Sequence, residues 1–198
     1  MQKVFKIITA FGFLSCIAAF VLLFIVQTPI THSAEITVVV PAHTTVATST
    51  LPVRLIIPKI SVNAAVESLG IAADGSMAVP VGPDDVAWFD LGAQPGDVGA
   101  AVIAGHSGWK DNIPAVFDNL YKLTVGDEIF VQNTDGTTAV FVVQGKKTYT
   151  KNADSSAVFN ANDGKAHLNL ITCAGAWNNV TKSSADRTVI FAEKLSEN

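Results

Sequence analysis

EIFVQNTDGTTAVFVV, residues 128–143, decides the fold class of this chain. Two runs rich in β-branched and aromatic residues flank the pair Asp135-Gly136, and such a pair favours the type I′ turn that suits the twist of two antiparallel strands. The stretch therefore predicts a β-hairpin with strands at residues 128–132 and 138–143. We expect the domain around this hairpin to be mostly β.

Five more runs of the same kind lie on either side of the hairpin. They cover residues 53–57, 62–66, 100–104, 168–172 and 188–192. Turn-forming pairs such as Asp74-Gly75 and Asp163-Gly164 occur between them. About seven or eight strands in residues 51–198 avoid exposed edges by closing into a barrel, although a sandwich of two sheets shows the same sequence pattern.

Residues 113–123 have a different spacing. The apolar side chains of Val116, Phe117, Leu120 and Leu123 fall at helical intervals. This pattern predicts one short helix, so the expected architecture is a closed β-barrel of about eight strands with one or two short helices.

The N-terminal segment predicts a membrane anchor. Residues 7–26 carry no charge over 20 positions, which matches the roughly 30 Å hydrocarbon thickness of a bilayer. Lys3 and Lys6 precede this transmembrane span, so the positive-inside rule keeps residues 1–6 in the cytoplasm and exports the rest of the chain. A cleaved signal peptide is the competing interpretation, although its apolar region is usually shorter.

The segment at residues 27–50 is rich in Thr, with Pro29 and Pro41, and too polar to build a core. It predicts a stalk between the membrane span and a domain at residues 51–198. The protein is therefore expected to be a single-pass protein of the cell membrane with a cytoplasmic N-terminus and an extracellular domain.

The composition excludes two classes of function. The net charge is −4 and no basic run exceeds Lys146-Lys147, so a nucleic-acid partner is not expected. The four histidines and two cysteines show no metal-ligand spacing, so we expect neither a metal site nor another cofactor. Cys16 and Cys173 lie at opposite ends of the chain, and a disulfide between them is not expected.

Three reactive side chains lie at the ends of apolar strands. His106 follows the strand at 100–104, Cys173 follows the strand at 168–172, and Arg187 opens the last strand. Taken singly, each has an ordinary interpretation as a solvated histidine, a structural cysteine or a surface charge. Together they predict a site assembled on a rigid sheet.

Two further residues are candidates for substrate binding near Cys173. Thr172 precedes it directly, and Trp177 follows in the next loop. The alternative interpretations are a β-branched strand residue and an aromatic side chain that packs in the core or at its rim.

The segments AVIAGHSG, LNLITCAG and DRTVIFA, in this order, make the chain resemble the sortase family. The spacings of 67 residues from His106 to Cys173 and of 14 residues to Arg187 also resemble that family, as does VFDNLYKLTVGDEIFV. The resemblance covers residues 52–194 and is greatest to class F, with class E as a neighbour. The segment CAGAWNN departs from the usual class F continuation.

The resemblance implies a cysteine transpeptidase on a sortase-like barrel. It implies cleavage of an LPXTG-like sorting signal on secreted proteins and transfer of the acyl product to an amine of a peptidoglycan precursor or a pilin lysine. Cys173 is the implied nucleophile that forms a thioester, and His106 the general acid and base. Arg187 is expected to stabilise the oxyanion or hold the substrate backbone.

Two alternatives stay open. A non-catalytic cell-surface binding module could use the same barrel as a scaffold, but it leaves the three reactive residues without a role. A hydrolase with the same Cys-His-Arg site differs only in using water in place of the amine. Papain-like and NlpC/P60-like peptidases are disfavoured because they place Cys before His, and L,D-transpeptidases because their SHGC-type motif is absent from the sequence.

Overall fold

The structure is a computed structural model that describes residues 50–150, 153–178 and 183–196, without the side chains of residues 176–178 and 183. Within these residues no helix is long and apolar enough to cross a membrane. The predicted membrane span at residues 7–26 and the stalk, apart from Thr50, lie outside the described residues.

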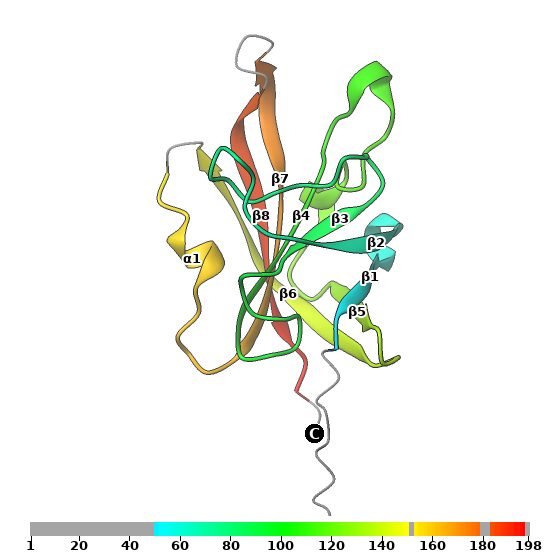
Figure 1. Cartoon of the computed structure of the whole chain (residues 1–198), viewed down its shortest axis with the longest axis vertical. Helices are drawn as coiled ribbons and strands as arrows, with labels where there is room; N and C mark the ends of the chain where they lie inside the picture. The colour runs from blue at the N-terminus through cyan, green and yellow to red at the C-terminus, as the bar shows by residue number, and fades with distance from the viewer. Residues whose placement is uncertain (1–49, 151–152, 179–182, 197–198) are drawn as a thin grey trace, which may run out of the picture. The chain divides into compact units, whose positions relative to one another are not determined.

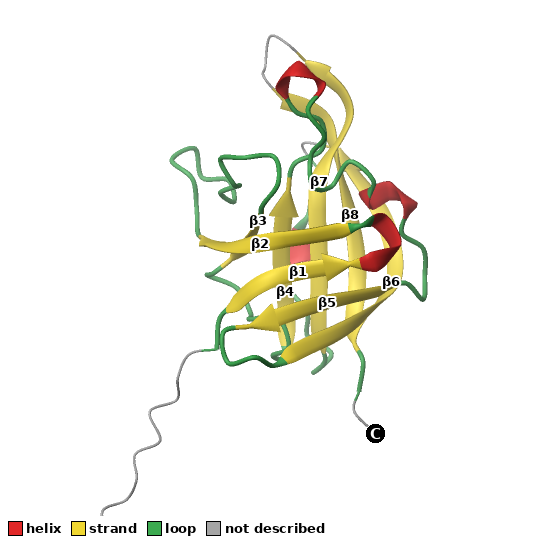
Figure 2. Cartoon of the chain, turned by 90° about the vertical axis from the view of Figure 1, so that its right-hand side faces the viewer, coloured by secondary structure: helices red, strands yellow, loops and turns green. Residues whose placement is uncertain are grey.

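Eight strands form a closed barrel (Figure 1). The strands are β1 (Pro52–Ile57), β2 (Val62–Leu69), β3 (Val86–Phe89), β4 (Gly99–Gly105), β5 (Glu128–Asn133), β6 (Thr138–Thr150), β7 (Ala166–Asn178) and β8 (Ser183–Lys194). Their order around the barrel is β1-β2-β3-β4-β7-β8-β6-β5, and β5 pairs back onto β1. In Figure 2, β1, β2 and β5 lie across the front and β4, β7 and β8 run behind them in another direction. The barrel is confirmed, and the sandwich is excluded.

The sequence missed one strand, β3, because it has only four residues and three of them are buried. A run this short has no visible alternation of apolar and polar residues. It pairs in parallel with β2 and antiparallel with β4, and so connects the β1–β2 pair to strands β4 and β7.

The predicted hairpin between β5 and β6 is confirmed, with Gln132 opposite Thr138. The turn type is wrong, because a type I′ turn needs positive φ at two central residues and here Gly136 has it (84°) while Asp135 does not. The N–H of Gly136 donates to the carbonyl of Asn133 (3.0 Å), which places Gly136 at the end of the turn.

The short helix predicted at residues 113–123 is confirmed only as a three-residue 3-10 turn. That segment contains only η3 (Leu120–Lys122), a three-residue 3-10 turn, after η2 (Lys110–Asn112). The side chains of Phe117, Leu120 and Leu123 are all buried in the barrel core, so their spacing reflects burial in successive turns. The one α-helix among the described residues is the single turn α1 (Ser156–Phe159).

Candidate active site

The register between β4 and β7 brings His106 and Cys173 together. The two strands are parallel, and every pair from Gly99↔Ala166 to Ala104↔Ile171 is separated by the same number of residues as His106 and Cys173. One step further, the hydroxyl of Thr172 donates to the carbonyl of Gly105 (2.8 Å). β4 ends at Gly105, and one more position of the same register would set His106 beside Cys173, at the spacing of about 5 Å between neighbouring strands.

Arg187 lies on the other side of Cys173. Strands β7 and β8 are antiparallel, and Cys173 is directly opposite Arg187 in their register. Directly opposed residues have Cα atoms about 4.5–5.5 Å apart and side chains on the same face of the sheet. Strands β7 and β8 therefore place Cys173 and Arg187 side by side, and the register of β4 leads to His106 on the other side of Cys173, so that the three residues form one row.

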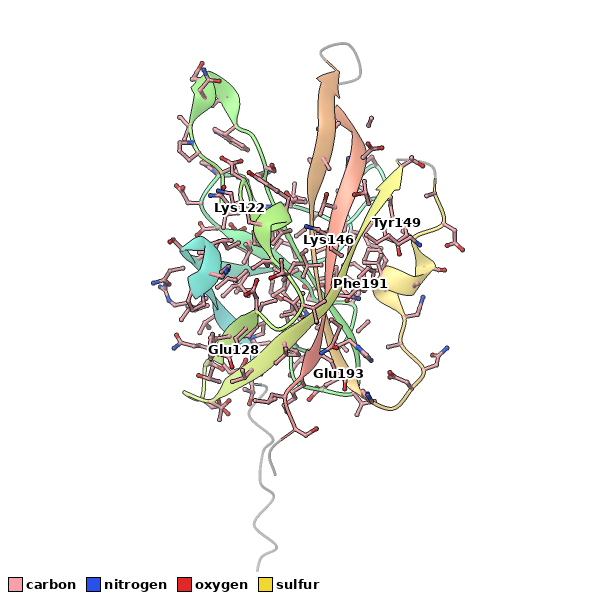
Figure 3. All side chains as sticks on the ribbon, turned by 180° about the vertical axis from the view of Figure 1, so that it is seen from behind. Lys122, Glu128, Lys146, Tyr149, Phe191 and Glu193 are labelled. Atoms are coloured by element: carbon pink, nitrogen blue, oxygen red, sulfur yellow. The ribbon has the colours of Figure 1, made fainter. Side chains whose placement is uncertain are left out.

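The side chains of Cys173 and Arg187 belong to the outer face of the barrel, because side chains alternate between the two faces of a strand, and the alternation along β4 leads to the same face at His106. Residues an even number of positions away on the same strands pack in a hydrophobic cluster outside the barrel: Val102, Ile171 and Val189. Tyr149 and Phe191, labelled in Figure 3, belong to this cluster on the side of α1. The candidate site thus lies at the end of β4, beside this buried cluster on the outer side of the barrel.

His106 is half-buried, and its ring is held from two sides. Its Nε2 lies 2.8 Å from the carbonyl oxygen of Pro80, and the ring of Trp109 contacts it edge to face at 4.7 Å between centroids. A carbonyl oxygen only accepts hydrogen bonds, so Nε2 carries the proton that is donated. Nδ1 is therefore the nitrogen left for another partner.

Gly105 allows the close approach that fixes the end of β4. A Cβ atom at this position would lie 2.7 Å from Cδ2 of Phe117 and 2.8 Å from Cγ1 of Val116. The N–H of Phe117 also donates to the carbonyl of His106 (2.9 Å). The backbone at His106 therefore rests directly on the segment around Phe117.

Arg187 is half-buried and anchored to its own strand. Its Nη1 donates to the carbonyls of Ser184 (3.1 Å) and Asp186 (2.9 Å). Among the described residues, its Nε and Nη2 groups make no hydrogen bond to protein, so these donors remain for a ligand. Tyr149, which is buried, lies opposite Arg187 on the β6 side.

The two substrate-binding candidates differ in what the structure says of them. Thr172 is buried, and its hydroxyl joins β7 to β4, so its side chain lines the barrel interior and does not face the row of three residues. Trp177 pairs through its backbone with Ser184 beyond a bulge at Gly175, and its side chain lies outside the described part of the chain.

Two residues at the site escaped the sequence analysis. Pro80 contributes only its carbonyl, which no side-chain pattern can reveal. Asp118 accepts hydrogen bonds from the backbone N–H groups of Gly108 (2.6 Å) and Ala115 (2.9 Å). The sequence shows that Asp118 directly follows Phe117, but this position does not distinguish it from any other aspartate in a turn.

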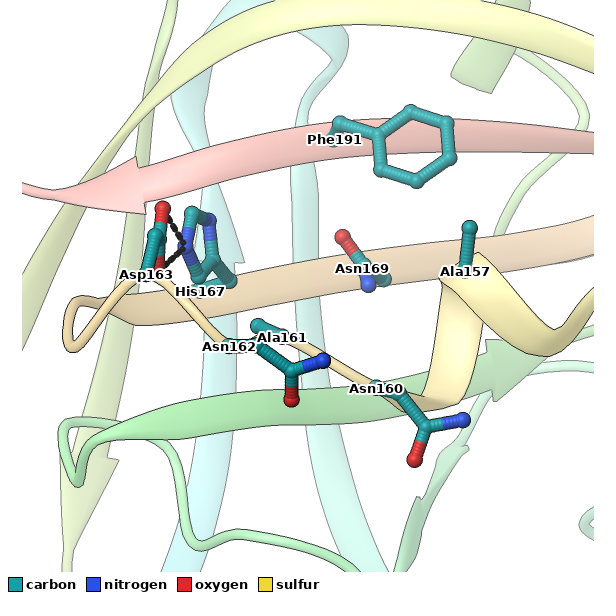
Figure 4. A pocket seen from close by; sticks show the side chains of 8 residues that line it. All are labelled: Ala157, Asn160, Ala161, Asn162, Asp163, His167, Asn169 and Phe191. Carbon is teal, nitrogen blue, oxygen red and sulfur yellow. Dashed lines mark hydrogen bonds and ion pairs between the residues drawn. The ribbon is translucent and has the colours of Figure 1, made fainter.

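A cavity of about 420 Å³ opens at the other end of β7 (Figure 4). Its wall contains the ion pair of His167 with Asp163 (2.9 Å) and the side chains of Asn169 and Phe191. Asn169 precedes Cys173 by four positions, about 13 Å along a strand, so this cavity is separate from the row of three residues. No cluster of three or more metal-binding side chains occurs in the described ranges.

Comparison with known proteins gives the family. The sortase domain family matches residues 55–195. Similar solved structures include sortase C-1 from Actinomyces oris, with 23% identity, a TM-score of 0.58 and coverage of 74% of this chain and 76% of that one. A lid mutant of sortase A from Corynebacterium diphtheriae has 21% identity, a TM-score of 0.58 and coverage of 75% and 72%. Sortase D5 transpeptidase from Clostridium perfringens has 25% identity, a TM-score of 0.55 and coverage of 73% and 79%.

None of the curated protein sequences compared with this chain matches it. The family match nevertheless covers more than two thirds of the chain, from β1 to the end of β8, and the solved sortases share its fold. The chain therefore belongs to the sortase family of cysteine transpeptidases.

Proposed function

We propose that this protein cleaves an LPXTG-like sorting signal on secreted proteins and transfers the acyl product to an amine of the cell wall or of a pilin. The observation that carries the proposal is the position of Cys173, directly opposite Arg187 and beside the end of β4, where the β4–β7 register leads to His106. A binding module needs no such row of nucleophile, proton carrier and fixed cation, whereas acyl transfer uses all three.

In the first half-reaction, the thiolate of Cys173 attacks the Thr carbonyl carbon of the sorting signal. The carbonyl oxygen gains negative charge, and the Nε and Nη2 donors of Arg187, which have no partner among the described residues, stabilise it or hold the adjacent substrate backbone. The C–N bond to Gly then breaks, and the imidazolium of His106 gives a proton to the leaving amine. The product is a thioester on Cys173.

In the second half-reaction, the acceptor amine attacks the thioester carbon. His106, now neutral, takes the proton of the amine, and the C–S bond breaks to restore the thiolate. Because Nε2 donates to the carbonyl of Pro80, Nδ1 is the nitrogen that gives and takes the proton. If water attacks the thioester in place of the amine, the result is hydrolysis, and an assay must distinguish this product from the transfer product.

The location follows from the sequence. The apolar span at residues 7–26 anchors the chain in the cell membrane, and the stalk holds the catalytic domain outside, where secreted substrates and cell-wall amines are found. The motif similarity favours class F, with class E next, as the subfamily of this protein.

Intact mass spectrometry tests the proposed reaction. All eight strands lie after residue 50, so a fragment of residues 46–198 is incubated with a library of LPXTG-like peptides and inspected for a thioester on Cys173. Cys173→Ala is the control that forms no adduct. An added amine such as triglycine separates transfer from hydrolysis by the mass of the product. A folded protein that forms no adduct with any peptide would refute the proposed function.

A further inference from the structure

The loop after His106 is tied to the segment at 115–118 by one carboxylate. Oδ1 of Asp118 accepts the N–H of Gly108 (2.6 Å), two residues beyond His106, and Oδ2 accepts the N–H of Ala115 (2.9 Å). Hydrogen bonds from backbone N–H groups to a charged acceptor are stronger than neutral ones. Asp118 therefore joins two loops that are otherwise separate in sequence.

The same segment holds the other parts of the His106 environment. The N–H of Phe117 donates to the carbonyl of His106 (2.9 Å), and the N–H of Val116 donates to the carbonyl of Pro83 (2.8 Å). Pro83 lies three residues from Pro80, whose carbonyl accepts the hydrogen bond of the His106 ring. Residues 115–118 thus hold both the backbone of His106 and the segment that holds its ring.

We propose that Asp118 is a positioning residue for His106. Its carboxylate fixes the loop at residues 106–108 against the 115–118 turn, and this keeps the imidazole in place beside Cys173. The inference rests on the proposed function for its kinetic consequence, but its structural content does not depend on any substrate. Asp118 is not a catalytic residue, since its two oxygens are both occupied by backbone N–H groups.

The chain contains a matched control for this residue. Asp127 repeats the local arrangement of Asp118, because its Oδ2 accepts the N–H of Thr124 (2.8 Å) and its own N–H donates back to the Thr124 carbonyl (3.1 Å). Asp118 makes the same exchange with Ala115, whose carbonyl accepts its N–H at 3.1 Å. Only Asp118 has the additional bond to Gly108. Asp127 instead accepts the hydroxyl of Thr124 (3.1 Å), so each Ala variant loses two side-chain hydrogen bonds, and a loss of kcat confined to the Asp118 variants points to the link with the His106 loop.

The test compares Asp118→Ala and Asp118→Asn with Asp127→Ala and Asp127→Asn in the full chain. We expect kcat to fall about 10- to 100-fold in Asp118→Ala, since a displacement of about 1 Å can have that effect, with KM little changed. Asp118→Asn keeps one acceptor oxygen and should lose less. The Asp127 variants should retain kcat even where they lower the melting temperature.

Nuclear magnetic resonance of the His106 ring gives a readout that does not require a substrate. In the wild type and in the Asp127 variants, the Nε2 proton should show the shift of a donor to a carbonyl, and in Asp118→Ala this signal should broaden or move. If the wild type forms no thioester, the proposed function fails while the ring signal still decides the positioning role.

Two outcomes would overturn the inference: an Asp118→Ala variant with wild-type kcat and an unchanged ring signal, or an equal loss of kcat in Asp127→Ala. If Asp118→Ala does not fold, the kcat and the His106 ring signal of Asp118→Asn are compared with those of the wild type instead. An Asn variant with wild-type kcat and ring signal overturns the inference, and a partial loss of both supports it.

Discussion

Gly105→Ala should lower both the stability of the barrel and the acylation rate, because the added methyl group would clash with side chains of the barrel core. A Cβ atom at Gly105 would lie 2.7 Å from Cδ2 and 2.8 Å from Cε2 of Phe117. Carbon atoms in favourable contact are about 3.5–4.0 Å apart, so the overlap is roughly 1 Å. The ring of Phe117 is buried in a packed core, and it cannot move away without displacing its neighbours.

The magnitude follows from the two ways in which this overlap can be relieved. Overpacking of this kind costs about 1–3 kcal/mol, which lowers the melting temperature by several degrees in a domain of this size. If the end of β4 moves instead, His106, the next residue, moves with it, and a displacement near 1 Å can reduce the rate about 100-fold. Both effects are expected, and thermal unfolding and the first-order acylation constant measure them separately.

Gly145→Ala is the matched control, since Gly145 also lies in a strand and a Cβ atom there would have nothing within 4 Å. It should leave stability and rate near the wild-type values. Phe117→Leu, which removes part of the ring, should recover only part of the activity when combined with Gly105→Ala, because the contact with Cγ1 of Val116 (2.8 Å) remains. A Gly105→Ala variant with wild-type melting temperature and acylation rate would contradict the close packing described for this position.

Three further predictions concern hydrogen bonds and protons. Thr172→Val should cost about 1–3 kcal/mol of unfolding free energy in denaturant titration, because it leaves the carbonyl at the end of β4 without its buried donor, whereas Thr172→Ser keeps the donor. The acylation constant should show a bell-shaped pH profile, because it requires the thiolate of Cys173 and the imidazolium of His106 together; a flat profile contradicts this. The hydrogen bond with His167 lowers the pKa of Asp163 in the folded protein, so this carboxylate stabilises the fold above its ordinary pKa and the gain disappears as pH falls through the lowered value. Asp163→Asn should therefore reduce the acid-side slope of unfolding free energy against pH, and an unchanged slope counts against the ion pair.

Most of the barrel could be predicted because each strand contains its own pattern. Turn pairs and β-branched runs located seven of the eight strands, since strand alternation and turn geometry are local properties. The strand β3 was not predicted because its four residues, mostly buried, show no alternation of apolar and polar side chains. The helix expected at residues 113–123 forms only as a three-residue 3-10 turn, for a different reason. Buried residues three and four positions apart occur in successive turns as well as in helices, and only the tertiary packing of Phe117 and Leu120 separates the two cases.

The reactive residues of the candidate site could be named from the sequence, but the residues that hold them could not. A cysteine, a histidine and an arginine at the ends of predicted strands can be recognised directly in the sequence. The supports are a carbonyl of Pro80, a missing Cβ at Gly105 and a carboxylate of Asp118 that reaches two backbone N–H groups. Each depends on which loop lies beside which, and no local pattern determines that.

The spacing between His106 and Cys173 acquires a physical meaning only from the sheet. The separation of 67 residues in the sequence does not by itself show that the two residues are close in space, since loops of any length could lie between β4 and β7. The parallel register has the same offset at every step from Gly99↔Ala166 onward, so the spacing records which residues are neighbours across two strands. A shift of that register by one residue would turn Cys173 towards the barrel interior, where Thr172 now donates to the carbonyl of Gly105. The buried hydroxyl of Thr172 thus helps to fix the register that keeps the nucleophile on the outer face.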